Sequence, residues 1–122
     1  MSHVVRIKTM VRDYAAVEAA CRQLRWPRPR RGEASLFSQT ISGLVMAVPD
    51  WVYQIVADLT SGQLQYDNHG GVWGDPKQLG RFLQAYAVEK TGIEARESGR
   101  ALVQRRLADG SFRLTIRVEG GS

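Results

Sequence analysis

The sequence contains a single cysteine, Cys21, so the chain cannot form an internal disulfide. Its longest uninterrupted apolar run, Leu44 to Val48, is far shorter than the roughly 20 residues that a membrane-spanning helix requires. The N-terminus also lacks the basic start and apolar stretch of a secretory signal. A chain of 122 residues normally forms one domain that buries its core without disulfides or metal ions. We therefore expect a single cytoplasmic domain over residues 1–122, with no membrane span.

Basic residues are missing from the middle of the chain. Residues 37–75 hold four aspartates and no lysine or arginine, whereas residues 1–36 hold eight basic and three acidic side chains, and residues 76–122 hold nine and five. The net charge of +5 therefore covers separate acidic and basic regions, which is not the pattern of a uniformly basic nucleic-acid-binding protein. Lysine is scarce, at three residues against fourteen arginines. Arginine favours planar pairing with carboxylates or phosphates, although the same bias fits a compositional preference of the source genome.

The common catalytic and cofactor-binding signatures are absent. The sequence has no GxGxxG, Walker loop, GxSxG or HExxH motif, and its two histidines and Cys21 do not have the spacing of a zinc site. We therefore expect no cofactor, no metal and no enzymatic activity. One catalytic alternative stays open, because His69 lies in a glycine turn near Asp67 and Asp75, and a carboxylate can orient an imidazole for acid–base chemistry. The competing interpretation is an exposed histidine without a chemical role.

Hydrophobic periodicity predicts an α+β fold. Alternating and β-branched segments predict strands at residues 3–9, 44–48, 51–59 and 63–67. Helical spacing predicts a helix over residues 14–25, with Asp13 as its N-cap, and a second helix that starts at Asp75-Pro76 and weakens at Gly92. We expect a mostly antiparallel sheet of about five or six strands with two main helices packed on it.

The C-terminal part of the sequence predicts a β-hairpin. Residues 101–107 and 112–118 flank Asp109-Gly110, a dipeptide typical of a two-residue hairpin turn. This register places Arg106 opposite Arg113, with Arg117 one step along the same face. Like charges in such positions destabilise a sheet unless an acidic group, in this chain or on a partner, lies beside them. The alternative is a solvated face, and residues 119–122 are expected to form a short disordered tail.

An arginine- and proline-rich segment follows the first predicted helix. Residues 25–35 are expected to form a flexible surface loop, because prolines and a glycine interrupt any periodic pattern there. Its candidate binding residues are Trp26, Arg28, Arg30 and Arg31. An aromatic ring among arginines is typical of proteins that bind single-stranded nucleic acid by stacking and phosphate contact. The alternatives are a solvated loop and a loop that docks on an acidic protein surface. Trp51 and Trp73, in the acidic block, are expected to be core residues or interface anchors.

Five motifs occur in one order over nearly the whole chain, and together they carry a resemblance to a known family. They are the Met-Ser-His start, Ile7-Lys-Thr9, Tyr53-Gln-Ile-Val-Ala-Asp58, Tyr86-Ala87 and Asp109-Gly-Ser-Phe-Arg-Leu114. The chain resembles the hypothetical chloroplast open reading frame thirty-five family, which comprises small cyanobacterial, plastid and bacterial proteins of unknown function. Residues 25–38 depart from the family pattern. The resemblance implies a compact α+β domain that works in a protein assembly, beside an ATPase of the ring-forming class, and it supplies no catalytic residues.

The sequence thus predicts a non-enzymatic protein-interaction module or small assembly subunit. It would dock through the arginine-rich loop together with an exposed sheet edge or a tryptophan-lined surface. The expected partners are other proteins, including the ring-forming ATPase or further copies of this chain. The alternative function is binding of RNA or single-stranded DNA through Trp26 and its neighbouring arginines.

Overall fold

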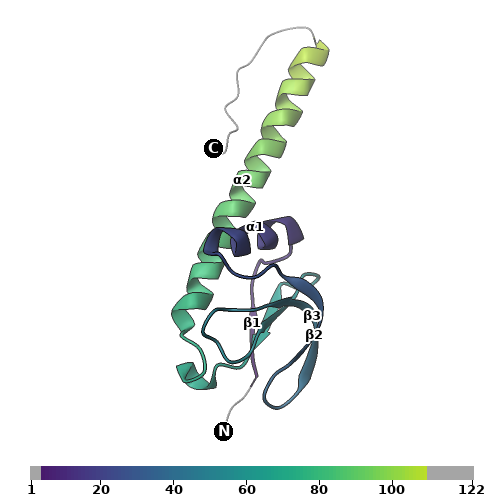
Figure 1. Cartoon of the computed structure of the whole chain (residues 1–122). Coiled ribbons are helices and arrows are strands. Elements are labelled where there is room, and N and C mark those ends of the chain that lie inside the picture. Colours follow the sequence, from purple (N-terminus) through teal and green to yellow (C-terminus); the bar gives the residue numbers. More distant parts are fainter. Residues whose placement is uncertain (1–3, 110–122) are drawn as a thin grey trace. The chain divides into compact units, whose positions relative to one another are not determined.

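The computed structural model describes the backbone of residues 4–109 and the side chains of residues 4–100 (Figure 1). The elements are β1 (Val5–Lys8), α1 (Tyr14–Leu24), β2 (Arg30–Ser35), β3 (Thr40–Met46), β4 (Ile55–Asp58), β5 (Gln63–Tyr66), the short 3₁₀ helix η1 (His69–Gly71) and α2 (Pro76–Asp109). The chain divides into two compact units, Met1–Tyr86 and Ala87–Ser122. The first unit contains the sheet, α1 and the start of α2. The predicted α+β class is confirmed.

The five strands form one antiparallel sheet in the order β1-β5-β4-β3-β2. Strands β2 to β5 are neighbours in sequence and in space, so they form a meander. Strand β1 pairs with β5 at one edge, while β2 forms the opposite edge. Because each pairing reverses the strand direction, β1 and β2 run the same way, and the connection that contains α1 has to cross three strands.

Strand register places the main core on one face of the sheet. Ile7, Leu64, Ala57 and Leu44 are cross-strand partners in successive strands, so their side chains point to the same face. Leu44, Ala57 and Leu64 are almost completely buried. The opposite face holds a smaller cluster of buried residues, consisting of Ala34, Val45 and Val56, with Ile41 packed against it. Both faces of the central strands are therefore covered, which explains why β4 has no exposed residue before Asp58.

Helix α1 begins and ends where its capping residues require. The Asp13 side chain accepts hydrogen bonds from the backbone N–H groups of Ala15 and Ala16, which have no partner inside the helix. At the other end Arg25 adopts a left-handed conformation (φ 63°), and the N–H of Trp26 donates to the carbonyl of Cys21. The predicted N-cap is thus confirmed. The buried stripe of α1 consists of small residues, which allows a close approach to its neighbours.

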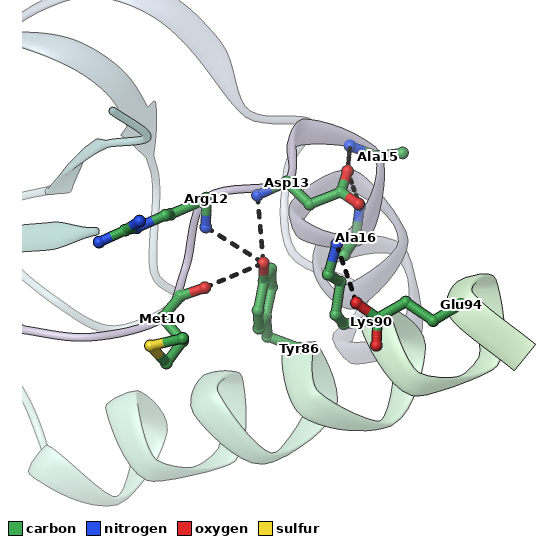
Figure 2. Close-up of polar contacts among 8 residues, drawn as sticks. All are labelled: Met10, Arg12, Asp13, Ala15, Ala16, Tyr86, Lys90 and Glu94. Atoms are coloured by element: carbon green, nitrogen blue, oxygen red, sulfur yellow. Dashed lines mark hydrogen bonds and ion pairs between the residues drawn. The ribbon is translucent and has the colours of Figure 1, made fainter. Parts of the chain in front are cut away.

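The start of α2 is joined to the start of α1 through one side chain. Asp75 caps α2 by accepting the N–H of Lys77 at 2.9 Å. One α2 stripe, including Leu79, Phe82 and Tyr86, is buried. As Figure 2 shows, the Tyr86 hydroxyl accepts hydrogen bonds from the N–H groups of Arg12 and Asp13, both at 3.1 Å, and donates to the Met10 carbonyl at 3.3 Å. This single hydroxyl therefore satisfies three backbone groups in the turn that leads into α1.

In the second unit, the structure describes the part of helix α2 that follows Tyr86. Its backbone continues through Gly92 and Gly99 without interruption, although the sequence predicted a weak point at the first of these glycines. An ion pair between Lys90 and Glu94, at 3.5 Å, links successive turns (Figure 2). No helix in the described part of the chain is both long and apolar enough to cross a membrane, even though α2 has 34 residues.

Two sequence-based predictions are corrected by these elements. Residues 30–35 form strand β2 rather than the end of a flexible loop, because pairing with β3 organises a segment whose side chains mostly face solvent. Residues 101–107 lie in α2 rather than in the first strand of a hairpin. This segment is rich in leucine, alanine, arginine and glutamine, which favour a helix as strongly as its alternation favours a strand. The second predicted strand, 112–118, and the tail at 119–122 lie outside the described residues.

Replacing Tyr86 by phenylalanine tests the contact between α2 and the turn before α1. The substitution keeps the ring but leaves three backbone groups of the turn without their partner, so we expect the free energy of unfolding to fall by about 1–3 kcal/mol. Urea denaturation of the full chain measures the change. Tyr53→Phe is the matched control, with an expected change within about 0.5 kcal/mol. If the free energy of unfolding falls equally in the two variants, the hydrogen bonds of the Tyr86 hydroxyl do not stabilise the fold.

Candidate interaction surface

Aromatic side chains from three separate loops meet around Trp73. Its ring lies 5.3 Å from Phe37 and 5.5 Å from Tyr53 between ring centroids, and His69 stacks on it at 4.5 Å with an interplanar angle of 24°. Phe37 comes from the β2–β3 loop, Tyr53 from the β3–β4 loop, and His69 and Trp73 from the connection between β5 and α2. The fold therefore brings together rings that are far apart in the sequence.

Large apolar side chains around these rings are exposed. Phe37 is 60% exposed, Val52 is 61% exposed and Val72 is 75% exposed. Val52 lies against the same cluster, because its N–H donates to the Trp73 carbonyl at 2.8 Å. We call Phe37, Val52, Tyr53, Val72 and Trp73 the aromatic patch. Phe37 contacts the Trp73 ring, Val52 is linked to Trp73 through the backbone, and Val72 precedes it in the chain. Clustered exposed apolar residues are characteristic of protein-binding sites, whereas single exposed apolar residues are ordinary.

The loops that carry the aromatic patch are fixed by buried contacts. The indole N–H of Trp51 donates to the Asp75 backbone carbonyl at 3.1 Å. The Trp51 ring packs against the Tyr66 ring of β5, with the two ring centroids 5.7 Å apart. Gly74 packs so closely against this indole that a Cβ atom there would clash with the ring. The buried Asn68 side chain donates to the Gly74 carbonyl at 3.1 Å. Trp51, at 9% exposure, is therefore a core residue that supports the patch and not part of its surface.

The predicted acid–base group around His69 is arranged differently from a catalytic pair. Asp67 accepts a hydrogen bond from the backbone N–H of His69 at 3.1 Å, while the imidazole ring stacks on Trp73. The second carboxylate oxygen of Asp67 is buried and has no hydrogen-bond partner among the described residues. Asp75 acts as the N-cap of α2. These three residues therefore shape the turn beside the aromatic patch.

Trp26 lies in the core, contrary to its expected role in an exposed loop. It is 6% exposed, and its ring stacks on Phe82 of α2, with centroids 5.7 Å apart and an interplanar angle of 16°. The left-handed Arg25 turns the chain back toward α2, which buries the indole instead of presenting it to solvent. In this position Trp26 offers no open ring face of the kind that stacks on a nucleic acid base.

Of the arginines in the same segment, Arg28 and Arg31 both contact the Tyr14 side chain, whereas Arg30 lies on the other face of the sheet. Arg28 is exposed and forms an ion pair with Glu18 of α1 at 2.8 Å. A hydrogen bond with the Tyr14 side chain, assisted by the Glu18 charge, raises the pKa of Arg28 above its ordinary value. Arg30 and Arg31 are neighbours on β2 and therefore point to opposite faces of the sheet. The four predicted residues of this segment consequently do not form one surface.

Three more arginines, near the C-terminal end of the sequence, were predicted as binding residues. Arg106 belongs to the helical residues of α2, while Arg113 and Arg117 lie outside the described residues. Because Arg106 lies in a helix, it is not in the strand that its predicted pairing with Arg113 requires.

The described residues contain neither a cluster of metal ligands nor an exposed thiol. In that part of the chain, no three histidine, cysteine, aspartate or glutamate side chains lie close enough together to hold a metal ion. Cys21 is 1% exposed, and burial, with a smaller effect of the nearby Glu18 carboxylate, raises the pKa of its thiol to about 11. The thiolate, which is the nucleophilic form, is therefore disfavoured at neutral pH.

Comparison with known proteins gives no match. The chain matches no family model, no curated protein and no solved structure. The resemblance to the chloroplast open reading frame family therefore stays a prediction.

Replacing Trp26 by alanine distinguishes a core residue from a ligand-stacking residue. Loss of the buried ring next to Phe82 is expected to reduce the free energy of unfolding by about 3–5 kcal/mol. Trp26→Phe keeps an aromatic ring at the position and should cost clearly less. Chemical denaturation followed by circular dichroism measures both variants. A fully stable alanine variant would contradict the buried position.

The Cys21 pKa predicts a loss of stability at high pH. The buried thiol holds its proton more tightly than an exposed thiol with its ordinary pKa of 9.0, so folding gains stability from this group below pH 9. This contribution, about 2–3 kcal/mol, decreases as the pH rises toward 11, because the unfolded chain loses the proton first. Denaturation curves between pH 8 and 11 measure the effect as the difference from Cys21→Ala, since other groups titrate in both proteins. If the free energy of unfolding changes with pH in the same way in the unaltered protein and in Cys21→Ala, the raised pKa of Cys21 is contradicted.

Proposed function

We propose that the protein is an interaction module that binds another protein through the aromatic patch. The observation that carries the proposal is the exposure of Phe37, Val52 and Val72 in the loops that meet at Trp73, which are held by buried contacts. Binding hot spots are enriched in tryptophan and tyrosine, and they lie near the centre of such surfaces. Loops that are already ordered lose little conformational entropy on binding.

The charge around the patch favours a partner segment with basic residues. All of its residues belong to the block 37–75, which has four aspartates and no lysine or arginine. Asp50, in the same loop as Val52, is exposed. A segment that inserts an apolar anchor and carries arginine or lysine beside it would match both properties. The ring-forming ATPase implied by the family resemblance is one protein against which this surface can be tested.

The nucleic-acid alternative has less support. It was based on Trp26 as a stacking residue beside several arginines, and this ring is packed against Phe82. The arginines of the segment also lie on different faces, and Arg28 is paired with Glu18. The cross-linking experiment below therefore treats binding of nucleic acid as the competing outcome.

Site-specific cross-linking tests the proposal. A photoreactive amino acid is placed at Val72, within the patch, or at Val88 of α2, which is 59% exposed and serves as the matched control. With the full chain in cells of its source organism, the first position should cross-link one defined protein and the second should not. The affinity of that protein is then measured for Val72→Asp and Val88→Asp. We expect at least about a tenfold loss in the first variant, corresponding to about 1.4 kcal/mol, and less than a twofold change in the second.

The charge of the partner is tested by Asp50→Asn. Asparagine tolerates the left-handed conformation of this residue (φ 69°), so the substitution removes the charge without disturbing the loop. It should weaken binding severalfold at low salt and have less effect at high salt. Equal affinities of the Val72 and Val88 variants would overturn the proposal. Cross-linking to nucleic acid, with affinity that falls steeply with salt, would instead favour the alternative.

A further inference from the structure

A second surface, separate from the aromatic patch, contains a pocket of about 530 Å³. It is lined by Leu44 and Ala57 of the sheet together with Gly43 and Leu59, and by the polar residues Arg12, Tyr14, Arg31, Ser42, Asp58 and Thr60. The volume lies within the range of small-molecule sites, and polar residues from several elements line it, as is common in such sites. The pocket lies within the first unit, so its walls belong to one compact body.

Two arginines reach this pocket from different elements. Arg31 is the cross-strand partner of Leu44, so its side chain lies on the main-core face of the sheet, at the β2 edge. Its guanidinium lies over the Tyr14 ring, 5.7 Å from the ring centroid. Arg12 comes from the turn between β1 and α1, and its guanidinium donates to the Ser61 carbonyl at 3.3 Å. Figure 2 shows this side chain extending away from α1.

Within the part of the chain that the structure describes, neither the Arg12 nor the Arg31 guanidinium forms an ion pair with an aspartate or glutamate oxygen within 4.0 Å. Of the described residues that line the pocket, one carries a carboxylate, Asp58, and it accepts the N–H of Thr60 at 2.9 Å. The neighbouring cleft of about 320 Å³ beside α1 provides a contrast, because its Arg28 is already paired with Glu18. The arginines of the larger pocket are therefore available to bind an anion, whereas Arg28 of the smaller cleft is already paired with a carboxylate.

We propose that this pocket binds a phosphate-bearing small molecule. Guanidinium groups match the geometry and charge of phosphate oxygens, and charge-assisted hydrogen bonds of this kind are stronger than neutral ones. Ser42 and Thr60, which also line the pocket, carry hydroxyl groups that can donate, and Tyr14 and the partly exposed Leu59 offer apolar surface to an organic group attached to the phosphate. The proposal goes beyond the protein-binding function, and it uses none of the residues of the aromatic patch.

Titration of the full chain with inorganic phosphate and with 5′-AMP, followed by NMR and calorimetry, tests the pocket. Both probes should bind with saturable amide shifts at Ser42 and Thr60, while acetate at the same concentration should not. Arg12→Gln and Arg31→Gln should each weaken binding by about tenfold or more. Arg22→Gln removes the same charge from an exposed position outside the pocket, and it should change the affinity by less than about twofold.

The outcomes separate the sources of phosphate and the competing explanations. Tighter binding of 5′-AMP than of inorganic phosphate assigns the pocket to a phosphorylated organic molecule, while equal binding assigns it to free phosphate. Thermal unfolding of each variant shows whether a lost affinity reflects a lost fold, and Arg31→Lys, which keeps the charge, should retain part of the binding. Absence of saturable binding, equal binding of acetate, or equal losses in the Arg22 and Arg31 variants of folded protein would overturn the proposal.

Discussion

The hydroxyl of Tyr86 is the contact on which the arrangement of the first unit depends. It binds three backbone groups between Met10 and Asp13, the short segment in which β1 has ended and α1 has not yet begun. The N–H groups of Arg12 and Asp13 precede the first turn of α1 and lie beyond the end of β1, and the Tyr86 hydroxyl supplies their acceptor. By fixing this segment, Tyr86 sets where Asp13 caps α1 and where Arg12 enters the pocket above the sheet. A residue of α2 thereby determines the geometry of elements near the N-terminus.

Tryptophans in this protein serve two different purposes. Trp26 and Trp51 are buried and hold other elements in place, the first against Phe82 and the second beneath the loop that ends at Gly74. Trp73 lies at the centre of exposed apolar side chains, but its own position depends on the same buried loop contacts. The aromatic patch therefore lies on the outer side of packed aromatic side chains, and contacts within the chain set its shape.

Local signals in the sequence were sufficient for the elements that depend on local physics. The caps Asp13 and Asp75 and the strand β5 follow from side chains that act within a few residues. The predicted strand 51–59 begins only at Ile55, and the one predicted at 44–48 covers 40–46, because loop contacts distant in sequence decide where these strands begin. Strand β2 could not be predicted in this way, because only Ala34 of its six residues is buried and no alternation results. The positions of Trp26 and of the exposed Phe37, Val52 and Val72 depend on partners distant in sequence. Tyr53 and Trp73 carry an aromatic signal, but nothing local indicates that loops bring them together.

The open edges of the sheet have a consequence for how copies of this protein behave toward one another. An antiparallel sheet with an unprotected outer strand can extend by pairing with the same strand of a second molecule. Here both outer strands carry neighbouring positive charges, Arg6 and Lys8 on β1 and Arg30 and Arg31 on β2. Contact between the β1 edges of two copies would bring these charges together, whereas β2 also carries Glu33, which supplies an opposite charge in any contact that involves that edge. The basic residues of β1 thus oppose extension of the sheet at the β1 edge.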